Sequence, residues 1–286
     1  MGDQDLIEDS EAGVDARDEE PSSEVNQVEN EAETLSPLGI YQPGMNWNAV
    51  EKVIFQRRST RSFKKEPLPD NMIRRILEAG RFAPSAGNGQ PWKFIVVKSP
   101  EIIAEMEKDA ENMAKRVMNL LDYTRSRIRR IFLRPFARFF IARMYNELAP
   151  QPFAAMRQVA AGKLKVFFNA PTLILVLIDS RGMSVPSIDS GIAGQNMVLA
   201  AHSMGASTCW IGMVSLIVNN PLGRSIAKKW KKFFGINDPY DLRNAIALGW
   251  PKARFDGAVP REVQLVDWYE GSMSDAPRVD QQGEEE

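Results

Sequence analysis

Apolar and polar residues repeat with the period of a helix along several stretches of this chain. Apolar side chains three or four positions apart share one face of a helix, so each such stretch predicts an amphipathic or buried helix. One of them, PLPDNMIRRILEAGRF, opens with prolines and an aspartate, which is typical of a helix N-terminus, and another, SIDSGIAGQNMVLAAHSM, ends at Gly205, a natural C-cap. Helices are therefore expected over residues 47–56, 67–82, 100–122, 187–204 and 220–234.

Short β-rich apolar runs lie between these stretches. KFIVVK (Lys93 to Lys98), LILVLID (Leu173 to Asp179) and NAIALG (Asn244 to Gly249) predict buried strands, and STCWIGMV (207–214) predicts a strand or a strand followed by a loop. Helices and strands alternate irregularly, without a repeated βαβ unit, which favours an α+β fold over a doubly wound sheet. No GxGxxG or GxxxxGK sequence is present, so Rossmann and P-loop folds have no support.

Charge is distributed unevenly along the 286 residues. Residues 1–34 hold 13 Asp and Glu but one Arg, and residues 271–286 hold 5 acids and one Arg. Setting both ends aside leaves 19 acidic and 34 basic residues over 35–270, a net charge of +15. We therefore expect a disordered acidic tail over 1–36, one domain over 37–270 and an acidic C-terminal tail over 271–286.

A basic central body favours anionic partners such as nucleotide phosphates, an acidic substrate or an anionic membrane surface. Solvation of an ordinary surface explains the same charge equally well. Nucleic acid is not expected, because no nucleic-acid-binding motif accompanies the charge. The N-terminus lacks a basic region followed by an apolar run, and no stretch has about 18 uninterrupted apolar residues. A cytoplasmic location is the expectation.

Few residues suit metal or nucleophilic chemistry. The single cysteine, Cys209, excludes an intramolecular disulfide and a Cys-cluster metal site, and the single histidine, His202, makes a His-rich metal site improbable. No base adjoins Cys209 in the sequence, so we interpret it as a packing residue. No metal is expected, and a bound organic cofactor would carry any reaction.

Two motifs close to one another in the sequence indicate which cofactor. RRSTRSF (Arg57 to Phe63) offers guanidinium forks and a hydroxyl, which suit a phosphate. APSAGNGQPW (Ala83 to Trp92) offers small residues, backbone donors and amides, so a planar polar ring could lie against its backbone. Phosphate binding and ring binding at this spacing suggest flavin mononucleotide (FMN).

The pair of motifs closely resembles the FMN-dependent nitroreductase family. The resemblance covers about Glu51 to Val97, Phe167 to Val214 and Ala245 to Trp268. It implies a three-layer α+β fold around a central mixed, mainly antiparallel sheet, and a homodimer with two FMN sites at its interface. Chemistry by the flavin is implied, with no side chain named as catalytic.

The resemblance assigns roles to residues in four segments. Backbone N–H groups of the segment with Trp210, Ile211 and Gly212 are implied to face flavin N5 and O4. The basic residue that returns to the phosphate is implied to be Arg261, with Lys252 and Arg254 as competing candidates. Asp189, Gln195 and Asn196 match the family's helix pattern and are expected to serve packing or the dimer. The phosphate, ribityl chain and pyrimidine edge are assigned to Arg57, Arg58, Ser59 and Arg61, and the ring contact from the partner subunit to Pro84, Ser85, Ala86, Gly87 and Asn88.

The implied activity is reduction of a small aromatic or conjugated acceptor by NADH or NADPH in a ping-pong scheme. A nicotinamide nucleotide delivers hydride to the flavin and leaves, and the acceptor then binds the same face. The same fold also supports reductive dehalogenation, flavin fragmentation and substrate dehydrogenation. A membrane-associated flavin-binding protein with little turnover is an alternative from another class.

The stretch over about 105–160 departs from the family pattern, and its core is YTRSRIRRIFLRPFARFFIARMY (Tyr123 to Tyr145). This core, Tyr123 to Tyr145, holds seven arginines and no acidic residue. The favoured interpretation is a helical cap over the flavin that selects substrate. The other two are an amphipathic element on an anionic membrane and plain packing by a helical hairpin broken at Pro135.

Overall fold

The computed structural model describes residues 47–122, 126–144, 151–183, 185–253, 266–272 and 278–279. The chain divides into two units, Met1–Trp47 and Asn48–Glu286. The fold described below is that of the second unit. The expected disordered tail over 1–36 and the cofactor candidates Arg254 and Arg261 lie outside the described residues.

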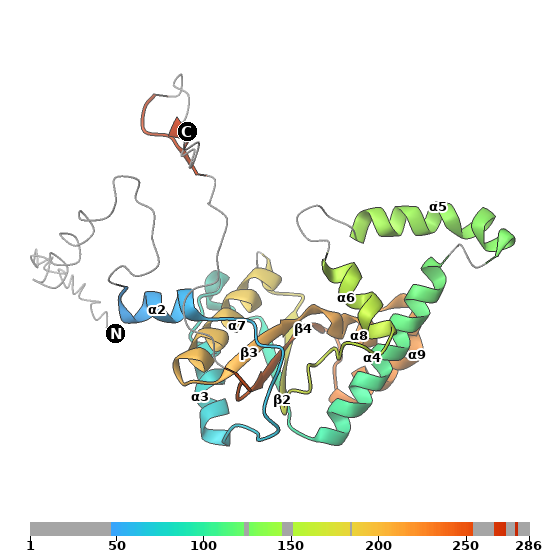
Figure 1. Ribbon diagram of the computed structural model, residues 1–286. Coiled ribbons are helices and arrows are strands. Elements are labelled where there is room, and N and C mark those ends of the chain that lie inside the picture. Colours follow the sequence, from blue (N-terminus) through green and yellow to red (C-terminus); the bar gives the residue numbers. More distant parts are fainter. Residues whose placement is uncertain are drawn as a thin grey trace, which may run out of the picture. The chain divides into compact units, whose positions relative to one another are not determined.

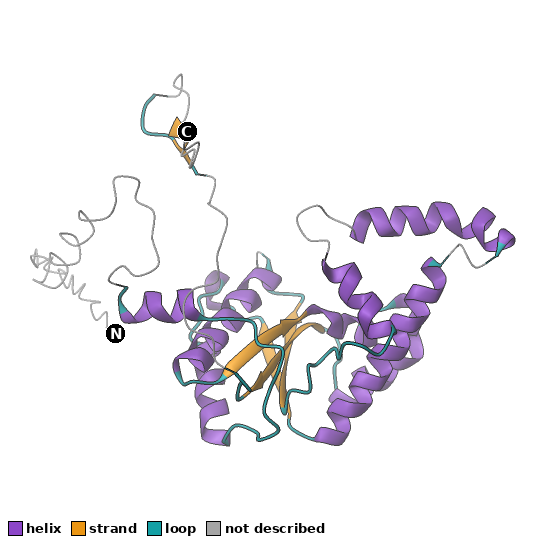
Figure 2. Cartoon of the chain, viewed as in Figure 1, coloured by secondary structure: helices purple, strands orange, loops and turns teal. Residues whose placement is uncertain are grey.

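A four-stranded antiparallel sheet forms the centre of this unit, in the order β1-β2-β4-β3 (Figures 1 and 2). The strands are β1 (Trp92–Val97), β2 (Thr172–Asp179), β3 (Ser207–Ile211) and β4 (Tyr240–Gly249). The register pairs Trp92 with Ile178, Thr172 with Leu248, and Ser207 with Gly249. All four predicted strands are therefore confirmed, and β4 begins four residues earlier than its apolar run suggests.

The helices lie on both faces of this sheet, as the three-layer α+β prediction requires (Figure 1). The five predicted helices are confirmed, although the last splits into a 3₁₀ turn and α9. The short helix α8 was not predicted. The helices are α2 (Ala49–Gln56), α3 (Asp70–Arg81), α4 (Pro100–Leu121), α5 (Arg127–Met144), α6 (Gln151–Ala160), α7 (Pro186–Ser203), α8 (Ser215–Val218) and α9 (Arg224–Phe234), with 3₁₀ turns η1 (Ala86–Asn88), η3 (Gly212–Val214) and η4 (Pro221–Gly223).

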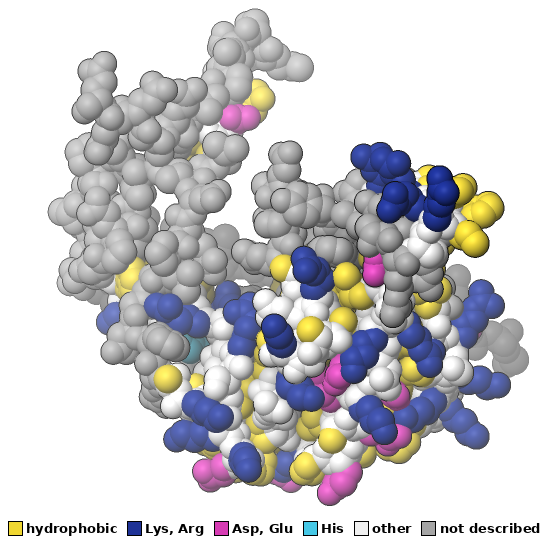
Figure 3. All heavy atoms as spheres, turned by 45° about the vertical axis from the view of Figure 1, so that its right-hand side comes forward, with side chains coloured by type: hydrophobic (Ala, Val, Ile, Leu, Met, Phe, Trp, Pro, Cys, Tyr) yellow, Lys and Arg dark blue, Asp and Glu magenta, His cyan; other side chains and the backbone are white. Residues whose placement is uncertain are grey.

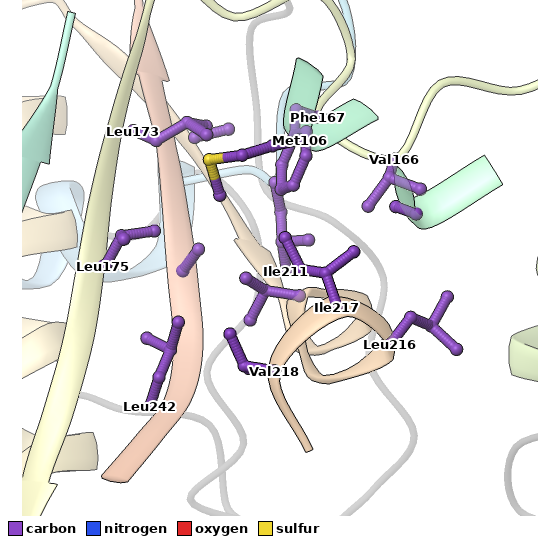
Figure 4. Packing of buried hydrophobic residues seen from close by; sticks show 14 of the residues in the cluster. Met106, Val166, Phe167, Leu173, Leu175, Ile211, Leu216, Ile217, Val218 and Leu242 are labelled. Carbon is purple, nitrogen blue, oxygen red and sulfur yellow. The ribbon is translucent and has the colours of Figure 1, made fainter. Parts of the chain in front are cut away.

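Strand β2 is buried from Thr172 to Ile178, because helices cover it on both sides. Its side chains alternate between the faces. Leu173, Leu175 and Leu177 join the larger apolar cluster with residues of α4, α8 and α9, part of which Figure 4 shows. Ile174 and Val176 join the smaller cluster with residues of α3 and α7. A continuous apolar run is thus what a strand covered on both faces needs.

Two local signals place the ends of helices that matter for the site. Asn48 and Glu51 form a capping box at the start of α2, with the Asn48 Oδ1 atom accepting from the Val50 and Glu51 amides at 2.9 and 3.0 Å. Ser99 caps α4 and Pro100 occupies its first turn. The capped α2 ends at Arg57, so the arginine motif starts where the helix stops.

Helix α5 differs from the sequence-based expectation, and the C-terminal segment adds a short strand pair. Helix α5 continues through Pro135, so the interpretation as a hairpin broken at that residue is wrong. Proline removes one amide donor, but the 18-residue helix extends on both sides of it. Within 271–286, where an acidic C-terminal tail is expected, β6 (Arg278–Val279) pairs with β5 (Asp267–Trp268).

Candidate functional site

The arginine motif runs alongside the edge strand β3. The Thr60 amide donates to the Thr208 carbonyl at 2.9 Å, and Ser59 and Thr208 form a parallel bridge. The Lys64 amide donates to the Trp250 carbonyl at 2.8 Å, and buried Phe63 bridges Pro251. Backbone bonds therefore fix the segment Arg57–Arg61 beside β3 and beside the end of β4.

Two cations of this segment, Arg57 and Arg61, are available to an anion. The Arg57 Nε atom is buried and has no hydrogen-bond partner. Among the described residues no carboxylate pairs with Arg57 or Arg61, and the Arg61 guanidinium carbon lies 6.0 Å from the centre of the Phe168 ring. A buried N–H without a partner costs stability unless a ligand satisfies it. The donor set fits a phosphate-bearing cofactor such as FMN.

Phe168 occupies a strained turn that a buried carboxylate holds in place. Phe168 and Asn169 both have φ near +54°, a region that bulky residues rarely adopt. Glu107 of α4 is 9% exposed, and its carboxylate accepts from the Val166 amide at 2.6 Å and the Phe167 amide at 2.9 Å. Sequence reasoning missed this contact. The available signal was an acidic residue among apolar positions of α4.

The arginine motif adjoins β3 at Thr208, and from there the strand runs through Cys209 to its end at Ile211. Cys209 is buried, and burial raises the pKa of its thiol although the charge of Arg61 acts in the opposite direction. Ile211 is buried and Gly212, which follows it, is exposed. The thiol therefore packs as the sequence suggested, and the chain reaches solvent at Gly212, where a flat ring could approach the backbone.

Trp210 packs against α7 so closely that only glycine fits opposite it. A Cβ atom on Gly194 would lie 2.2 Å from the Trp210 Cη2 atom. Such a distance is far inside van der Waals contact. Gly194 thus sets how near β3 lies to α7.

The Pro84–Asn88 segment consists of η1 and the two residues before it, and it contacts the first turn of α7. Gly87, Asn88 and Gln90 have φ of +58°, +52° and +45°. The Gln90 amide donates to the Ser85 hydroxyl oxygen at 2.9 Å, and the Ala86 amide donates to the Asp189 Oδ2 atom at 3.4 Å. The loop is therefore shaped by its own side chains and tied to α7.

Within one chain, this loop and the arginine motif lie at opposite edges of the sheet. The loop leads into β1, whereas Arg57–Arg61 runs beside β3, and β2 and β4 separate these two strands. Three strand spacings amount to about 14 Å. The structure therefore joins Arg57–Arg61 with the Cys209–Met213 segment, but leaves Pro84–Asn88 on the other side of the sheet.

Of the three basic candidates late in the chain, the structure describes Lys252 alone. The Lys252 amide donates to the Ser62 carbonyl at 3.2 Å, so Lys252 adjoins the arginine motif. Arg254 and Arg261 lie outside the described residues. The assignment of Arg261 to the phosphate stays a prediction.

The polar residues expected on α7 do contribute to packing. Asp189 is 8% exposed and holds the Ala86 amide, while the Asn196 Nδ2 atom donates to the Ala79 carbonyl of α3 at 3.2 Å. Gln195 is half-buried.

Over the described ranges, no helix is long and apolar enough to cross a membrane.

Comparisons with known proteins point to one family and one fold. The sequence model described as the Nitroreductase family matches residues 54–250. A Methanothermobacter thermautotrophicus protein with the provisional name NADH dehydrogenase/NAD(P)H nitroreductase is 26% identical over 228 residues, which cover 77% of this chain and 87% of that protein. Iodotyrosine deiodinase of Drosophila melanogaster is 24% identical over 247 residues, covering 75% of this chain and 77% of that protein.

A solved structure shares the fold. The crystal structure of a nitroreductase with bound FMN from Desulfitobacterium hafniense aligns with a TM-score of 0.55 at 26% sequence identity. The alignment covers 77% of this chain and 100% of that one. The family match and this alignment confirm the expected fold.

Proposed function

This chain belongs to the nitroreductase family, and we propose that it is an FMN-dependent oxidoreductase that uses NADH or NADPH to reduce a small aromatic or conjugated acceptor. The observation that carries the proposal is the 2.9 Å bond between the Thr60 amide and the Thr208 carbonyl. It places the arginines suited to a phosphate beside the strand whose end exposes backbone to a ring.

Each segment has a defined task in this proposal. Arg57, Arg58, Ser59 and Arg61 hold the phosphate end, where the unpartnered Arg57 Nε atom supplies a donor. Lys252 is the described basic residue beside them, and Arg261 is the candidate from the undescribed part. Trp210, Ile211 and Gly212 supply the backbone edge. Half-buried Trp210 packs against Gly194 of α7, and buried Ile211 joins the apolar cluster on the other face of the sheet, so the edge is held from both sides.

FMN, when bound, supplies two-electron chemistry, which we propose follows the ping-pong order of one nucleotide and then one acceptor. The protein binds, orients and excludes water. Arg61 is held over the Phe168 ring by a turn that Glu107 fixes, so its charge stays near the site without an acidic partner among the described residues.

We propose that the site is completed in a homodimer. Pro84, Ser85, Ala86, Gly87 and Asn88 lie across the sheet from Arg57–Arg61, so in one chain the two motifs face different edges. A two-fold dimer brings the loop of one subunit to the arginines of the other. This arrangement gives both motifs a role in the same FMN site.

Reductive dehalogenation is the second candidate. The match to iodotyrosine deiodinase over 77% of that protein favours it. Turnover of nitroaromatic and of iodinated phenolic acceptors, measured side by side under anaerobic conditions, separates the two. Reduction of the iodinated acceptor alone would replace the first proposal by the second.

The first experiment measures the cofactor. The purified protein should be yellow, release FMN on denaturation, and lose its oxidised-flavin absorption when mixed anaerobically with NADH or NADPH. Arg57→Gln should weaken FMN binding about 10- to 100-fold, the value of a hydrogen bond to a charged group. Arg75→Gln on exposed α3 surface is the matched control and should change nothing. A protein that stays colourless after incubation with FMN would contradict the proposal.

A mixing experiment tests the dimer. Arg57→Gln and Gly87→Val are expressed separately and together, since Val at φ +58° distorts the loop. Each variant alone should lose FMN. Random mixed dimers carry one intact site in half of the dimers, so co-expression should restore about a quarter of the parental FMN content. No recovery on mixing would place both motifs in one chain's site.

A further inference from the structure

Helix α5 exposes cations and large apolar side chains together. Ile128, Ile131 and Phe132 are 71%, 67% and 74% exposed. Arginines 127, 130, 134 and 138 of the same helix are also exposed. Dark blue and yellow side chains are visible together on α5 at the upper right of Figure 3. Single apolar residues are common on a protein surface, but several large ones exposed close together indicate an interaction site.

The two kinds of side chain occupy neighbouring sectors of the helix. At 100° per residue, the four exposed arginines fall within a sector of about 80°, and Ile128, Ile131 and Phe132 fall within a sector of about 100° beside it. Leu133, which is half-buried, lies on the opposite side from Ile131. Over its described side chains, α5 thus has one apolar side and one cationic side next to it.

The segment that contains α5 is itself strongly positive. The segment 123–145 holds seven arginines and no Asp or Glu. None of the exposed α5 arginines forms an ion pair with a described carboxylate, whereas Lys229 of α9 pairs with Glu105 and Asp109 at 2.6 and 2.8 Å. The cationic side of α5 is therefore left for an anion outside the described chain.

The extent of the cationic side indicates what that anion is. Arg127 and Arg138 are eleven positions apart, which corresponds to about 16 Å along the helix. A small acceptor molecule covers a fraction of that length. A second copy of α5 presents the same positive charge and would be repelled. An extended anionic layer with an apolar layer beneath it matches both sides of the helix at once.

We propose that α5 lies in the interface of an anionic lipid membrane, with Ile128, Ile131 and Phe132 inserted and the arginines at the level of the headgroups. The contact is peripheral, since no helix among the described residues could span a bilayer. It is a function separate from the proposed flavin chemistry. It would place the enzyme next to lipid-soluble acceptors.

The test is flotation of the full-length, FMN-loaded protein with vesicles. One set contains phosphatidylcholine alone, and the other contains about 30% phosphatidylglycerol, at low and at high salt. Binding is expected to the anionic set at low salt and to fall steeply as salt rises. Arg130→Gln with Arg134→Gln should weaken it about 30-fold, since each cation near the surface contributes about a factor of five. Ile131→Ser with Phe132→Ser should weaken it at least as much.

The matched control uses a second cationic helix. Lys228 and Lys232 of α9 are exposed beside a pocket of about 840 Å³ that also contains Arg224. Lys228→Gln with Lys232→Gln removes the same charge from a different surface and should leave vesicle binding within about twofold of the parent, because α5 itself is unchanged. All variants change exposed residues, and unchanged thermal unfolding shows that they fold.

Three results would overturn the proposal. The parent protein fails to float with anionic vesicles at low salt. The α9 control loses binding as much as the α5 variants do, which indicates general attraction. The α5 variants keep vesicle binding and instead raise KM for aromatic acceptors in vesicle-free solution, which indicates a substrate cap.

Discussion

The arginine motif Arg57–Arg61 and helix α5 are both rich in arginine, but the protein holds them in different ways. The motif follows a capped helix and is fixed to β3 and to the end of β4 by backbone hydrogen bonds. Helix α5 packs against α4 and exposes most of its described side chains. A fixed cluster suits a small anion of defined shape, whereas an exposed helical row suits an extended surface. The structural setting of the arginines therefore indicates their binding partner better than how many there are.

The largest effect is expected at Glu107, because it holds the turn that carries Phe168, the ring beside Arg61. Glu107→Ala leaves the buried Val166 and Phe167 amides without an acceptor, which should lower the free energy of unfolding by about 2–5 kcal/mol. Phe168 then loses its position under Arg61, so FMN affinity should fall too. Denaturant unfolding and FMN fluorescence titration measure the two effects.

The control for Glu107 lies on the same helix. Glu105→Ala removes an exposed partner of Lys229 and should cost less than about 1 kcal/mol. Vesicle binding should be the same in both variants, because neither touches the exposed sides of α5. Equal losses of stability in the two variants would show that the buried carboxylate has no special role.

The next effect concerns the contact that positions β3. Gly194→Ala places a methyl group 2.2 Å from the Trp210 ring and should destabilise the fold by about 1–3 kcal/mol, with weaker FMN binding. Gly191→Ala on the same helix meets no atom within 4 Å and should be neutral or stabilising by up to about 1 kcal/mol. Thermal unfolding of the pair separates steric conflict from helix propensity. A stable Gly194→Ala protein with full FMN content would show that Gly194 does not set the position of β3.

Much of the fold could be predicted from the sequence because its signals are local. The apolar run of β2 and the cap of α2 depend on residues next to one another in the chain. The fixed site was less accessible. The motif Arg57–Arg61 was recognised, but its contact with Thr208 joins residues about 150 positions apart, and the Glu107 contact with Val166 joins helix α4 to a distant turn. Such pairings carry no periodic pattern.

Helix α5 shows the opposite case. Its arginines and aromatic residues were evident, but its continuation through Pro135 was not, because proline's usual effect argued for a break. Which of its side chains stay exposed depends on what α4 covers. The sequence favoured a substrate cap, and the membrane interpretation gained its support only once Ile128, Ile131 and Phe132 were seen to be exposed.

The smallest effect sharpens the comparison from the side of α4. The Lys115 ammonium, 2.6 Å from the Glu111 Oε1 atom, lowers the pKa of the Glu111 carboxyl below its ordinary value of 4.5, and Lys165 adds to this. A lowered pKa in the folded state stabilises the protein above pH 4.5, and the contribution disappears as the pH falls through the folded-state pKa. Glu111→Gln should therefore lower stability by about 0.5 kcal/mol at pH 7, because the pair is partly exposed, and the difference should be smaller at pH 3. Urea unfolding at both pH values measures this; a difference that persists undiminished at pH 3 would show that Glu111 acts through packing and not through its charge.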